Sequence, residues 1–370
     1  MKILIAQDFL RSGGTERQSV LLANAFAAAG HTVTLLTFRP GGALAGTVAP
    51  GVLRRVLQPF DLGLDWLAPR LVAQARAAAP DVLLCMGRMA NCYAGRLQRA
   101  LPGSVVIATM RTGKSLPALF RASLRRVTHI VANSRDAAET LSREHRVPAG
   151  KISIIYNSLV FPAEMGGGAP PRRSPNPLRA AHEAADSTTV LLNVAMFRPE
   201  KNQRELIEIV AGLPGQLDWQ LWLAGDGPAR AACEQLVAQR NLRARVKFLG
   251  FHRNPGPLYR AADLAVHASW SEALSNFLIE AQAHGLLGVA YEAQGIAECF
   301  LPGRTGWVIP RNDRAAFRAT LSRRISEPRS AHDERAADAR AYARTTFDPA
   351  RQVAAYLALF GRLTSRHRSP

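Results

Sequence analysis

The chain has 370 residues, of which 48% are hydrophobic and 20% are charged. This composition is that of a globular protein with a full hydrophobic core and excludes general disorder, and the length favours two domains. The formal net charge of +19, from 47 Lys and Arg against 28 Asp and Glu, indicates a positive surface that attracts anions such as nucleotides, anionic lipids or nucleic acid.

The four cysteines are dispersed and form no CxxC pair, so the sequence indicates neither a disulfide framework nor a zinc site. The opening stretch MKILIAQDF has one lysine and an apolar run that is too short for a signal peptide. Because no stretch of about 18 apolar residues follows it, we expect a cytoplasmic chain whose contact with a membrane, if it makes one, is peripheral.

Short apolar runs alternate with helical patterns through the first half of the chain. Strands are predicted at 2–9, 31–38, 81–87, 104–110 and 128–134. Residues 16–30 have the pattern of an amphipathic helix that ends at Gly30. Strands that alternate with helices predict a parallel sheet with both faces covered.

A Gly- and Pro-rich stretch at 162–177 interrupts this alternation, which then resumes. Further strands are predicted at 187–197, 218–225, 245–251, 264–269, 288–293 and 305–310. The predicted domains are therefore 1–165 and 187–347, and 166–186 is a linker and poorly patterned segment. A last amphipathic helix at 348–364 either caps the second domain or crosses back to the first. We predict an α/β fold of two Rossmann-like, doubly wound parallel-sheet domains, with a ligand cleft between them at the carboxyl ends of the strands.

The loop RSGGTER, between the first predicted strand and the first helix, is the first candidate ligand loop. Gly13 and Gly14 allow the backbone to approach a ligand closely, and the N–H groups at the start of the helix suit an anion. The pattern is neither GxGxxG nor a Walker loop, so it supports neither nicotinamide binding nor P-loop chemistry. An ordinary turn is the alternative.

Basic and glycine-rich loops follow the first strands of the second half. Arg198 and Lys201 stand at a strand-to-helix turn, where two cations suit a diphosphate, and a solvated helix start is the alternative. Gly225 permits the strand-ending turn LAGDGPAR, which we expect to contribute to the ligand-binding site. The strand VKFLGF contains Leu249, whose backbone we expect near a nucleobase edge. Both of these segments are also compatible with a purely structural role.

The stretch SWSEALSNFLIEAQAHG, residues 269–285, carries two glutamates. Ser275 is the predicted N-cap of a helix that Gly285 closes, which places Glu272 in the loop before the helix and Glu280 in its second turn. Carboxylates accept hydrogen bonds from sugar hydroxyls, and the helix N-terminus between them donates N–H groups to phosphate. The layout therefore fits a sugar, a diphosphate and a ribose. The alternative is one surface glutamate and one capping interaction.

Together these segments resemble family four of the retaining glycosyltransferases, whose members have the GT-B fold of two Rossmann-like domains. The resemblance rests on GGTER, YNS, RPEKN, LAGDGP, VKFLG, GIAE and GRTGWVIP, and on LYRAADLAVHASWSEALSNFLIEAQAHG, in which residues 272–280 match the family's EX7E motif. It implies an enzyme that transfers a sugar from a UDP- or GDP-sugar with retention of the anomeric configuration. The chain has no DxD motif, and the resemblance implies no metal ion and no other cofactor.

The resemblance also implies a role for each candidate residue. Glu280 would hold the ribose hydroxyls and Glu272 the donor sugar. Arg198 and Lys201 would neutralise the leaving diphosphate, which the glycine pair of the RSGGTER loop would approach from the acceptor-binding first domain. The backbone near the phosphates and the sugar would be that of Leu274, Ser275, Asn276 and Phe277.

Two positions depart from the family's pattern. In the family, a basic residue usually stands five places before the lysine of the RPEKN segment, which is Lys201 here. This chain has Met196 at that position, and we expect Arg198 to take over the role of the basic residue. A histidine is frequent after the strand at 104–110, where this chain has Arg111, so we expect Arg111 to contact the donor sugar.

The resemblance implies a glycan or glycolipid acceptor, in bacterial surface polysaccharide or lipopolysaccharide synthesis, often at the inner face of the membrane. Residues 116–127 interleave apolar side chains with arginines, the apolar ones being Leu116, Phe120, Leu124 and Val127. Such a helix either lies on anionic lipid or covers the sheet with a wet arginine face.

Two other functions remain open at this point. A nucleotide-sugar epimerase would share the fold, although the EX7E resemblance counts against it. A basic nucleic-acid-binding protein would fit the charge, but the arginines are dispersed and only 7% of the residues are aromatic, so we expect no nucleic acid partner.

Overall fold

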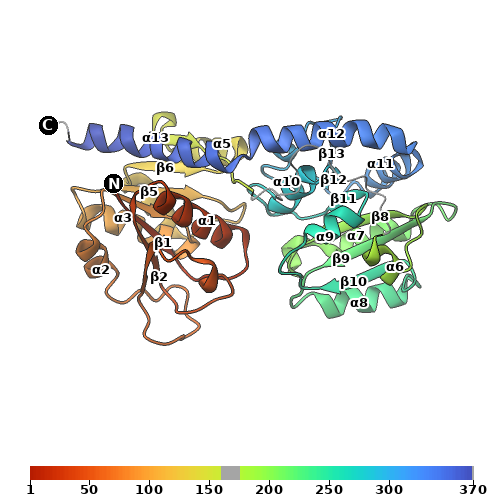
Figure 1. Ribbon diagram of the computed structural model, residues 1–370, viewed down its shortest axis with the longest axis horizontal. Coiled ribbons are helices and arrows are strands. Elements are labelled where there is room, and N and C mark those ends of the chain that lie inside the picture. Colours follow the sequence, from red (N-terminus) through yellow and green to blue (C-terminus); the bar gives the residue numbers. More distant parts are fainter. Residues whose placement is uncertain (160–175, 369–370) are drawn as a thin grey trace. The chain divides into compact units, whose positions relative to one another are not determined.

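The computed structural model describes residues 1–159 and 176–368, and the chain divides into two compact units (Figure 1). Unit 1 joins Met1–Ser158 to the C-terminal segment that starts at Pro349, and unit 2 is Leu159–Asp348. Each unit has an α/β architecture around its own parallel sheet. The first part of the predicted linker, residues 166–175, lies outside the described residues, and its second part contains a short helix at Pro177–Ala181.

In unit 1 the described strands form a seven-stranded parallel sheet with the order β3-β2-β1-β4-β5-β6-β7. The strands are β1 (Lys2–Gln7), β2 (Thr32–Thr37), β3 (Val52–Val56), β4 (Val82–Cys85), β5 (Val105–Met110), β6 (His129–Ala132) and β7 (Ile152–Ile154). The helices are α1 (Gly14–Ala28), η1 (Ala45–Thr47), α2 (Leu71–Ala78), α3 (Arg88–Ala100), α4 (Ala118–Arg126), α5 (Arg135–Arg143), η2 (Ala149–Lys151) and α13 (Pro349–Arg368).

Helices cover both faces of this sheet. Successive side chains of a strand point to opposite faces, so each strand contributes to two buried clusters. In β1, Leu4 packs with the α2, α3, α4 and α5 side, whereas Ile5 packs with the α1 and α13 side. The C-terminal helix α13 runs along β5 and β6 (Figure 1), and its Tyr356 and Phe360 meet Phe26 of α1 edge to face. The last helix therefore completes the core of unit 1, although the chain reaches it from unit 2.

In unit 2 the described strands form a six-stranded parallel sheet with the order β10-β9-β8-β11-β12-β13. The strands are β8 (Thr189–Val194), β9 (Trp219–Ala224), β10 (Val246–Gly250), β11 (Leu264–His267), β12 (Leu287–Tyr291) and β13 (Gly306–Ile309). The helices are α6 (Pro177–Ala181), η4 (Pro199–Lys201), α7 (Gln203–Ala211), α8 (Arg230–Gln239), α9 (Gly256–Ala261), α10 (Asn276–Ala283), η5 (Ala297–Cys299), α11 (Arg314–Ser326) and α12 (Arg329–Thr346).

Every strand that the sequence predicted is present, and the sequence missed two more. β3 carries two arginines at the edge of its sheet, and β7 has only three residues, so neither has the apolar run of a central strand. Among the described residues, no helix combines the length and the apolar character that crossing a bilayer requires.

The basic helix predicted at 116–127 is α4, and it covers the sheet. Its apolar stripe is buried in the unit 1 core, with the side chains of Leu116, Phe120, Leu124 and Val127 at most 4% exposed. The hypothesis that this stripe lies on lipid is therefore wrong, since the same side chains cannot face both the core and a bilayer.

Candidate functional site

The candidate site of unit 2 lies where the direction of chain winding reverses in the sheet. β8 and β11 are neighbours, and from them the chain proceeds to β9 on one side and to β12 on the other. Open parallel sheets bind ligands beside the carboxyl ends of the strands at this point. The loops concerned follow β8, with residues 195–202, and β11, with residues 268–275.

Hydrogen bonds to backbone carbonyl oxygens fasten these two loops to each other. Ser269 Oγ donates a hydrogen bond to the carbonyl oxygen of Glu200 at 2.9 Å, and the N–H of Trp270 donates to the same oxygen at 3.2 Å. Asn202 takes a left-handed conformation, with φ of 54°, and its side-chain amide donates to the carbonyl of Ala268 at 3.4 Å. The loop that carries Glu272 is therefore held against the turn that carries Lys201.

The side chains of Lys201, Glu272 and His267 meet at this junction. Lys201 Nζ lies 2.6 Å from Glu272 Oε1, and His267 Nε2 lies 2.9 Å from the same oxygen. Burial raises the pKa of Glu272, but the charge of Lys201 and the hydrogen bond with His267 outweigh it and hold this pKa at about 2. Glu272 is 8% exposed, and its Oε2 has no hydrogen-bond partner among the described residues. The carboxylate is ionised and has one oxygen available to a ligand hydroxyl.

Glu280 lies on α10, whose N-cap is Ser275 as predicted: Ser275 Oγ accepts a hydrogen bond from the N–H of Leu278. Glu280 Oε2 accepts a hydrogen bond from the Tyr259 hydroxyl at 2.6 Å. The ring of Tyr259 stacks at 6.2 Å on Phe277, whose ring lies 5.7 Å from that of His267. An unbroken series of contacts thus connects Glu280 to Glu272 around the first turn of α10.

Glycines allow the loop after β9 to approach the loop after β8. Gly225 has φ of +138°, and a Cβ there would lie 2.0 Å from the carbonyl oxygen of Ala195. Gly227 has φ of +148°, and its Cβ would lie 2.4 Å from the carbonyl oxygen of Phe197. Leu249 is half-buried near the end of β10, and its carbonyl oxygen contacts His252 Nε2 at 3.1 Å. The close approach of Ala195 therefore explains why residue 225 is a glycine, without any ligand. The predicted contact of Leu249 with a nucleobase stays a prediction.

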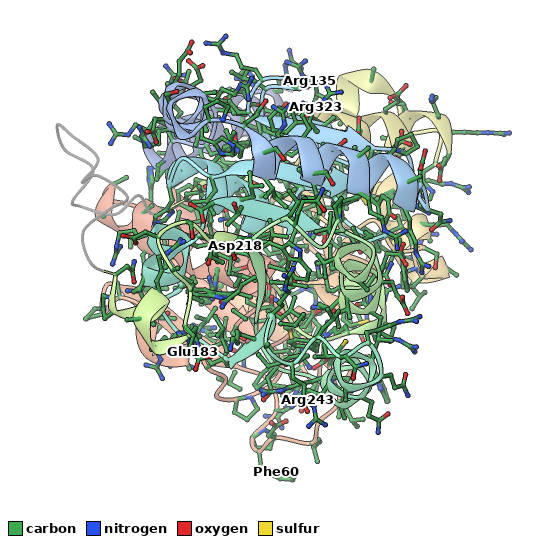
Figure 2. The ribbon with its side chains drawn as sticks, turned by 90° about the vertical axis from the view of Figure 1, so that its right-hand side faces the viewer. Phe60, Arg135, Glu183, Asp218, Arg243 and Arg323 are labelled. Atoms are coloured by element: carbon green, nitrogen blue, oxygen red, sulfur yellow. The ribbon has the colours of Figure 1, made fainter. Side chains whose placement is uncertain are left out.

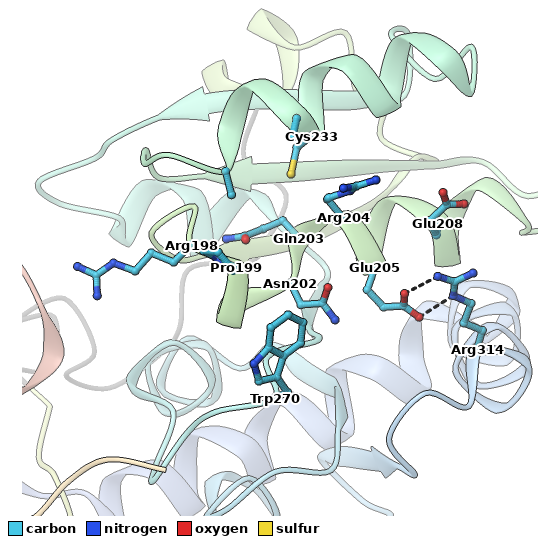
Figure 3. A pocket seen from close by; sticks show the side chains of 12 residues that line it. Arg198, Pro199, Asn202, Gln203, Arg204, Glu205, Glu208, Cys233, Trp270 and Arg314 are labelled. Atoms are coloured by element: carbon cyan, nitrogen blue, oxygen red, sulfur yellow. Dashed lines mark hydrogen bonds and ion pairs between the residues drawn. The ribbon is translucent and has the colours of Figure 1, made fainter. Parts of the chain in front are cut away.

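Arg198 stands beside this junction and lines a cavity of about 540 Å³ next to the first turn of α7. In Figure 3, Arg198 lies at one end of the cavity and the ion pair between Glu205 and Arg314 lies at the other. The Arg198 side chain has no hydrogen bond or ion pair within the described part of the chain, and Trp270, 45% exposed, also lines the cavity. The Arg198 guanidinium is therefore available to bind an anionic ligand. Lys201 is available only in part, because its ammonium group also pairs with Glu272.

The unit 1 candidates have partners within their own unit. Gly13 is the N-cap of α1 and Gly14 begins the helix, and a Cβ at Gly13 would lie 2.5 Å from Glu16 Oε2. Arg111 donates hydrogen bonds through both terminal nitrogens, to Asn157 Oδ1 and to the Tyr356 hydroxyl of α13. Arg111 thus tethers the C-terminal helix, and its contact with the donor sugar stays a prediction.

The sequence did not predict two further polar residues at strand ends, His267 in unit 2 and Asp8 in unit 1. His267 is the last residue of β11, and a histidine in the otherwise apolar run LAVH was the available signal. Asp8 follows β1, which neighbours β4 where the winding of the unit 1 sheet reverses, and it accepts hydrogen bonds from the N–H groups of Met89 and Ala90. Burial raises the pKa of Asp8 to about 6 against the effect of these bonds. Asp8 fixes the start of α3 to the end of β1.

No three His, Cys, Asp or Glu side chains within residues 1–159 and 176–368 are grouped as a metal ion would require.

The chain matches two family models in tandem. Residues 12–159 match the model described as Glycosyltransferase Family 4, and residues 176–346 match the model described as Glycosyl transferases group 1. The chain is a family-4-like glycosyltransferase of the GT-B fold. These matches favour neither an epimerase nor a nucleic-acid-binding protein, so the transferase prediction is confirmed.

One relative of this glycosyltransferase is a protein of lipopolysaccharide core biosynthesis. The lipopolysaccharide core biosynthesis glycosyltransferase LpsE of Rhizobium meliloti (strain 1021) is 26% identical over 329 residues, which are 86% of this chain and 87% of that protein. Among solved structures, HepE of Anabaena in complex with UDP superposes with a TM-score of 0.80 at 21% identity, over 98% of this chain and 100% of that one. HepE has also been solved with UDP-glucose. The structural likeness shows the fold.

Proposed function

We propose that this glycosyltransferase moves a sugar from a nucleotide-diphosphate sugar, with UDP as the preferred nucleotide, to a glycan or glycolipid acceptor. The UDP and UDP-glucose complexes of HepE, whose fold is similar, support UDP as the donor nucleotide. The relation to LpsE supports an acceptor of the lipopolysaccharide or surface polysaccharide class. The single observation that carries the donor assignment is the ionised Glu272 held by Lys201 and His267 beside the N-terminus of α10.

In this proposal different segments of unit 2 bind the ribose, the phosphates and the sugar of the donor. Glu280 accepts hydrogen bonds from the ribose, and the first turn of α10, from Leu274 to Phe277, donates N–H groups to the phosphates. Glu272 Oε2 accepts a hydrogen bond from a hydroxyl of the donor sugar. Lys201 has three N–H donors, so its ammonium group can keep Glu272 and still reach a phosphate oxygen.

Catalysis then depends on stabilising the leaving group. The bond between the sugar C1 and the phosphate oxygen breaks, and the acceptor oxygen bonds to C1 on the same face, which retains the configuration. The acceptor proton passes to an oxygen of the departing phosphate. Lys201 and Arg198 act on the negative charge that grows on the diphosphate, which is the kind of preorganised electrostatic stabilisation that contributes most to many enzymes. Neither glutamate serves as a nucleophile in this scheme.

We assign the acceptor to unit 1. Unit 1, which matches the family 4 model, would bind the glycan or the lipid-linked acceptor. The four cysteines are buried free thiols, which is compatible with a reducing cytoplasmic compartment. In this proposal the enzyme works in the cytoplasm and meets a lipid-linked acceptor at the inner face of the membrane as a peripheral protein.

Calorimetry with a panel of UDP-, GDP- and ADP-sugars and the free nucleotides tests the donor assignment. We expect binding of UDP and of at least one UDP-sugar, and release of UDP only when an acceptor is added. An epimerase would instead convert the bound donor sugar without acceptor and without release of nucleotide. Absence of binding by every member of the panel would contradict the proposed function.

A further inference from the structure

His267 is a polar side chain buried at the end of an apolar strand. The charged side chains labelled in Figure 2, such as Arg243 and Arg323, are exposed at the surface. His267, by contrast, is only 1% exposed, and its ring packs 5.7 Å from that of Phe277 on α10. An apolar side chain would fill this position without bringing polar atoms that need hydrogen bonds. The reason for a histidine must therefore lie in the hydrogen bond that it makes.

The contacts of the His267 ring determine where its proton lies. Although burial raises the pKa of Glu272, Lys201 and His267 hold it at about 2, so Glu272 is ionised and can only accept hydrogen bonds. His267 Nε2, 2.9 Å from Glu272 Oε1, must therefore carry a proton. Nδ1 is buried and has no hydrogen-bond partner within residues 1–159 and 176–368. A proton on Nδ1 would be a buried donor without an acceptor, so the ring is neutral and protonated at Nε2 alone.

Lys201 and His267 hold the same carboxylate oxygen but differ in how freely they can move. Both reach Oε1 of Glu272, at 2.6 Å and 2.9 Å. The Lys201 side chain is 26% exposed and has a flexible four-carbon stem, so it can turn toward a phosphate that binds beside it. His267 has a short, buried side chain, and its backbone lies in the sheet opposite Ala290 of β12. His267 is therefore the contact that Glu272 keeps when Lys201 turns to the diphosphate.

We propose that His267 is a positioning residue for sugar transfer, which keeps Glu272 Oε2 directed at a hydroxyl of the donor sugar while Lys201 follows the charge on the departing diphosphate. The role requires one N–H donor at the position of Nε2, which the neutral ring supplies. This inference rests on the proposed function. If the native chain transfers no sugar, the proposed function fails and the tautomer can still be measured. If the native chain transfers sugar and the His267 variants keep this activity, only the present inference fails.

Nuclear magnetic resonance of the nitrogen-labelled full chain tests the tautomer without any substrate. The ring signals of His267 are those that disappear from the spectrum when His267→Gln is introduced. At neutral pH we expect one protonated and one bare ring nitrogen, the protonated one being Nε2. A proton on Nδ1, alone or together with one on Nε2, would overturn the proposal.

Steady-state kinetics of transfer from a UDP-sugar test the role of the hydrogen bond. His267→Leu removes the donor, and His267→Gln keeps an amide N–H near the position of Nε2. His267→Asn carries the same amide on a shorter side chain, which does not reach Glu272. The matched control is His129→Leu, which removes another buried strand histidine, whose Nε2 lies 2.9 Å from Ser153 Oγ in unit 1. Thermal melting of each variant shows whether the fold is kept.

We expect His267→Leu and His267→Asn to lower kcat by on the order of tenfold to a hundredfold, because Glu272 loses its fixed direction, and to bind UDP as the native chain does. His267→Gln should recover most of the lost kcat, and His129→Leu should keep the native kcat. If His267→Leu does not fold, the comparison of His267→Gln with His267→Asn decides. The proposal is overturned if kcat stays native without the Nε2 donor, if His267→Gln recovers no more than His267→Asn, or if UDP affinity falls as much as kcat.

Discussion

Replacement of Glu272 by glutamine should destabilise unit 2 by an amount that depends on pH. The pKa of about 2 in the folded chain, against an ordinary value of 4.5, corresponds to about 3 kcal/mol of stabilisation of the carboxylate. Because the folded pKa is the lower one, this stabilisation is fully present above pH 4.5 and is lost as the pH falls toward 2. Glu272→Gln should therefore be less stable by up to about 3 kcal/mol at neutral pH, and by much less at a pH of about 3.

Denaturant unfolding followed by tryptophan fluorescence measures this difference, since Trp219 and Trp222 are buried in the core of unit 2. The matched control is Glu234→Gln, which removes the same charge from the exposed i,i+4 pair with Arg230. It should change the stability by less than about 1 kcal/mol. A Glu272→Gln difference that is absent, or that stays constant between neutral and acidic pH, would refute the assignment of an ionised carboxylate held by Lys201 and His267.

Three further substitutions test other parts of the donor site. Lys201→Met should cost about 2–4 kcal/mol of transition-state stabilisation, read from kcat/KM, and an unchanged kcat/KM would count against its contact with the diphosphate. Glu280→Gln should weaken UDP binding. Tyr259→Phe keeps the Glu280 carboxylate and should bind UDP nearly as the native chain does. Equal losses of UDP affinity in the two variants would assign the effect to the hydrogen bond between Tyr259 and Glu280. Gly225→Ala should lower the melting temperature of unit 2, because a Cβ there meets a carbonyl oxygen at 2.0 Å. Gly215→Ala, with open space around the glycine, should not.

The fold was largely readable from the sequence because local patterns determine it. Each apolar run of the central strands formed a strand, and Ser275 caps its helix as the spacing of polar and apolar residues indicated. The edge strand β3 escaped detection because its two arginines break the apolar pattern, and an edge strand tolerates them. The direction of the apolar stripe of α4 could not be read either, since a helix covering a sheet and a helix lying on lipid have the same sequence pattern.

The sequence names candidate members of the site but does not reveal their contacts. The EX7E motif located Glu272 and the RPEKN segment located Lys201, yet these residues are 71 positions apart. Only the neighbouring positions of β8 and β11 bring them together. His267 was missed because a single histidine at a strand end has no spacing that distinguishes it from a core residue. The hydrogen bond of Arg111 to Tyr356 could not be read from the sequence, because Tyr356 is 245 positions away and reaches Arg111 only through the return of the last helix to unit 1.

The most direct test of the proposed donor site compares the two glutamates of the EX7E motif by calorimetry and by transfer from the same UDP-sugar. We expect Glu280→Ala to lose affinity for UDP itself, because the ribose contact is lost. We expect Glu272→Ala to bind UDP as the native chain does and to fail in sugar transfer, because its contact is with the sugar. Native UDP affinity in Glu280→Ala together with native transfer in Glu272→Ala would contradict the division of the donor between these two carboxylates.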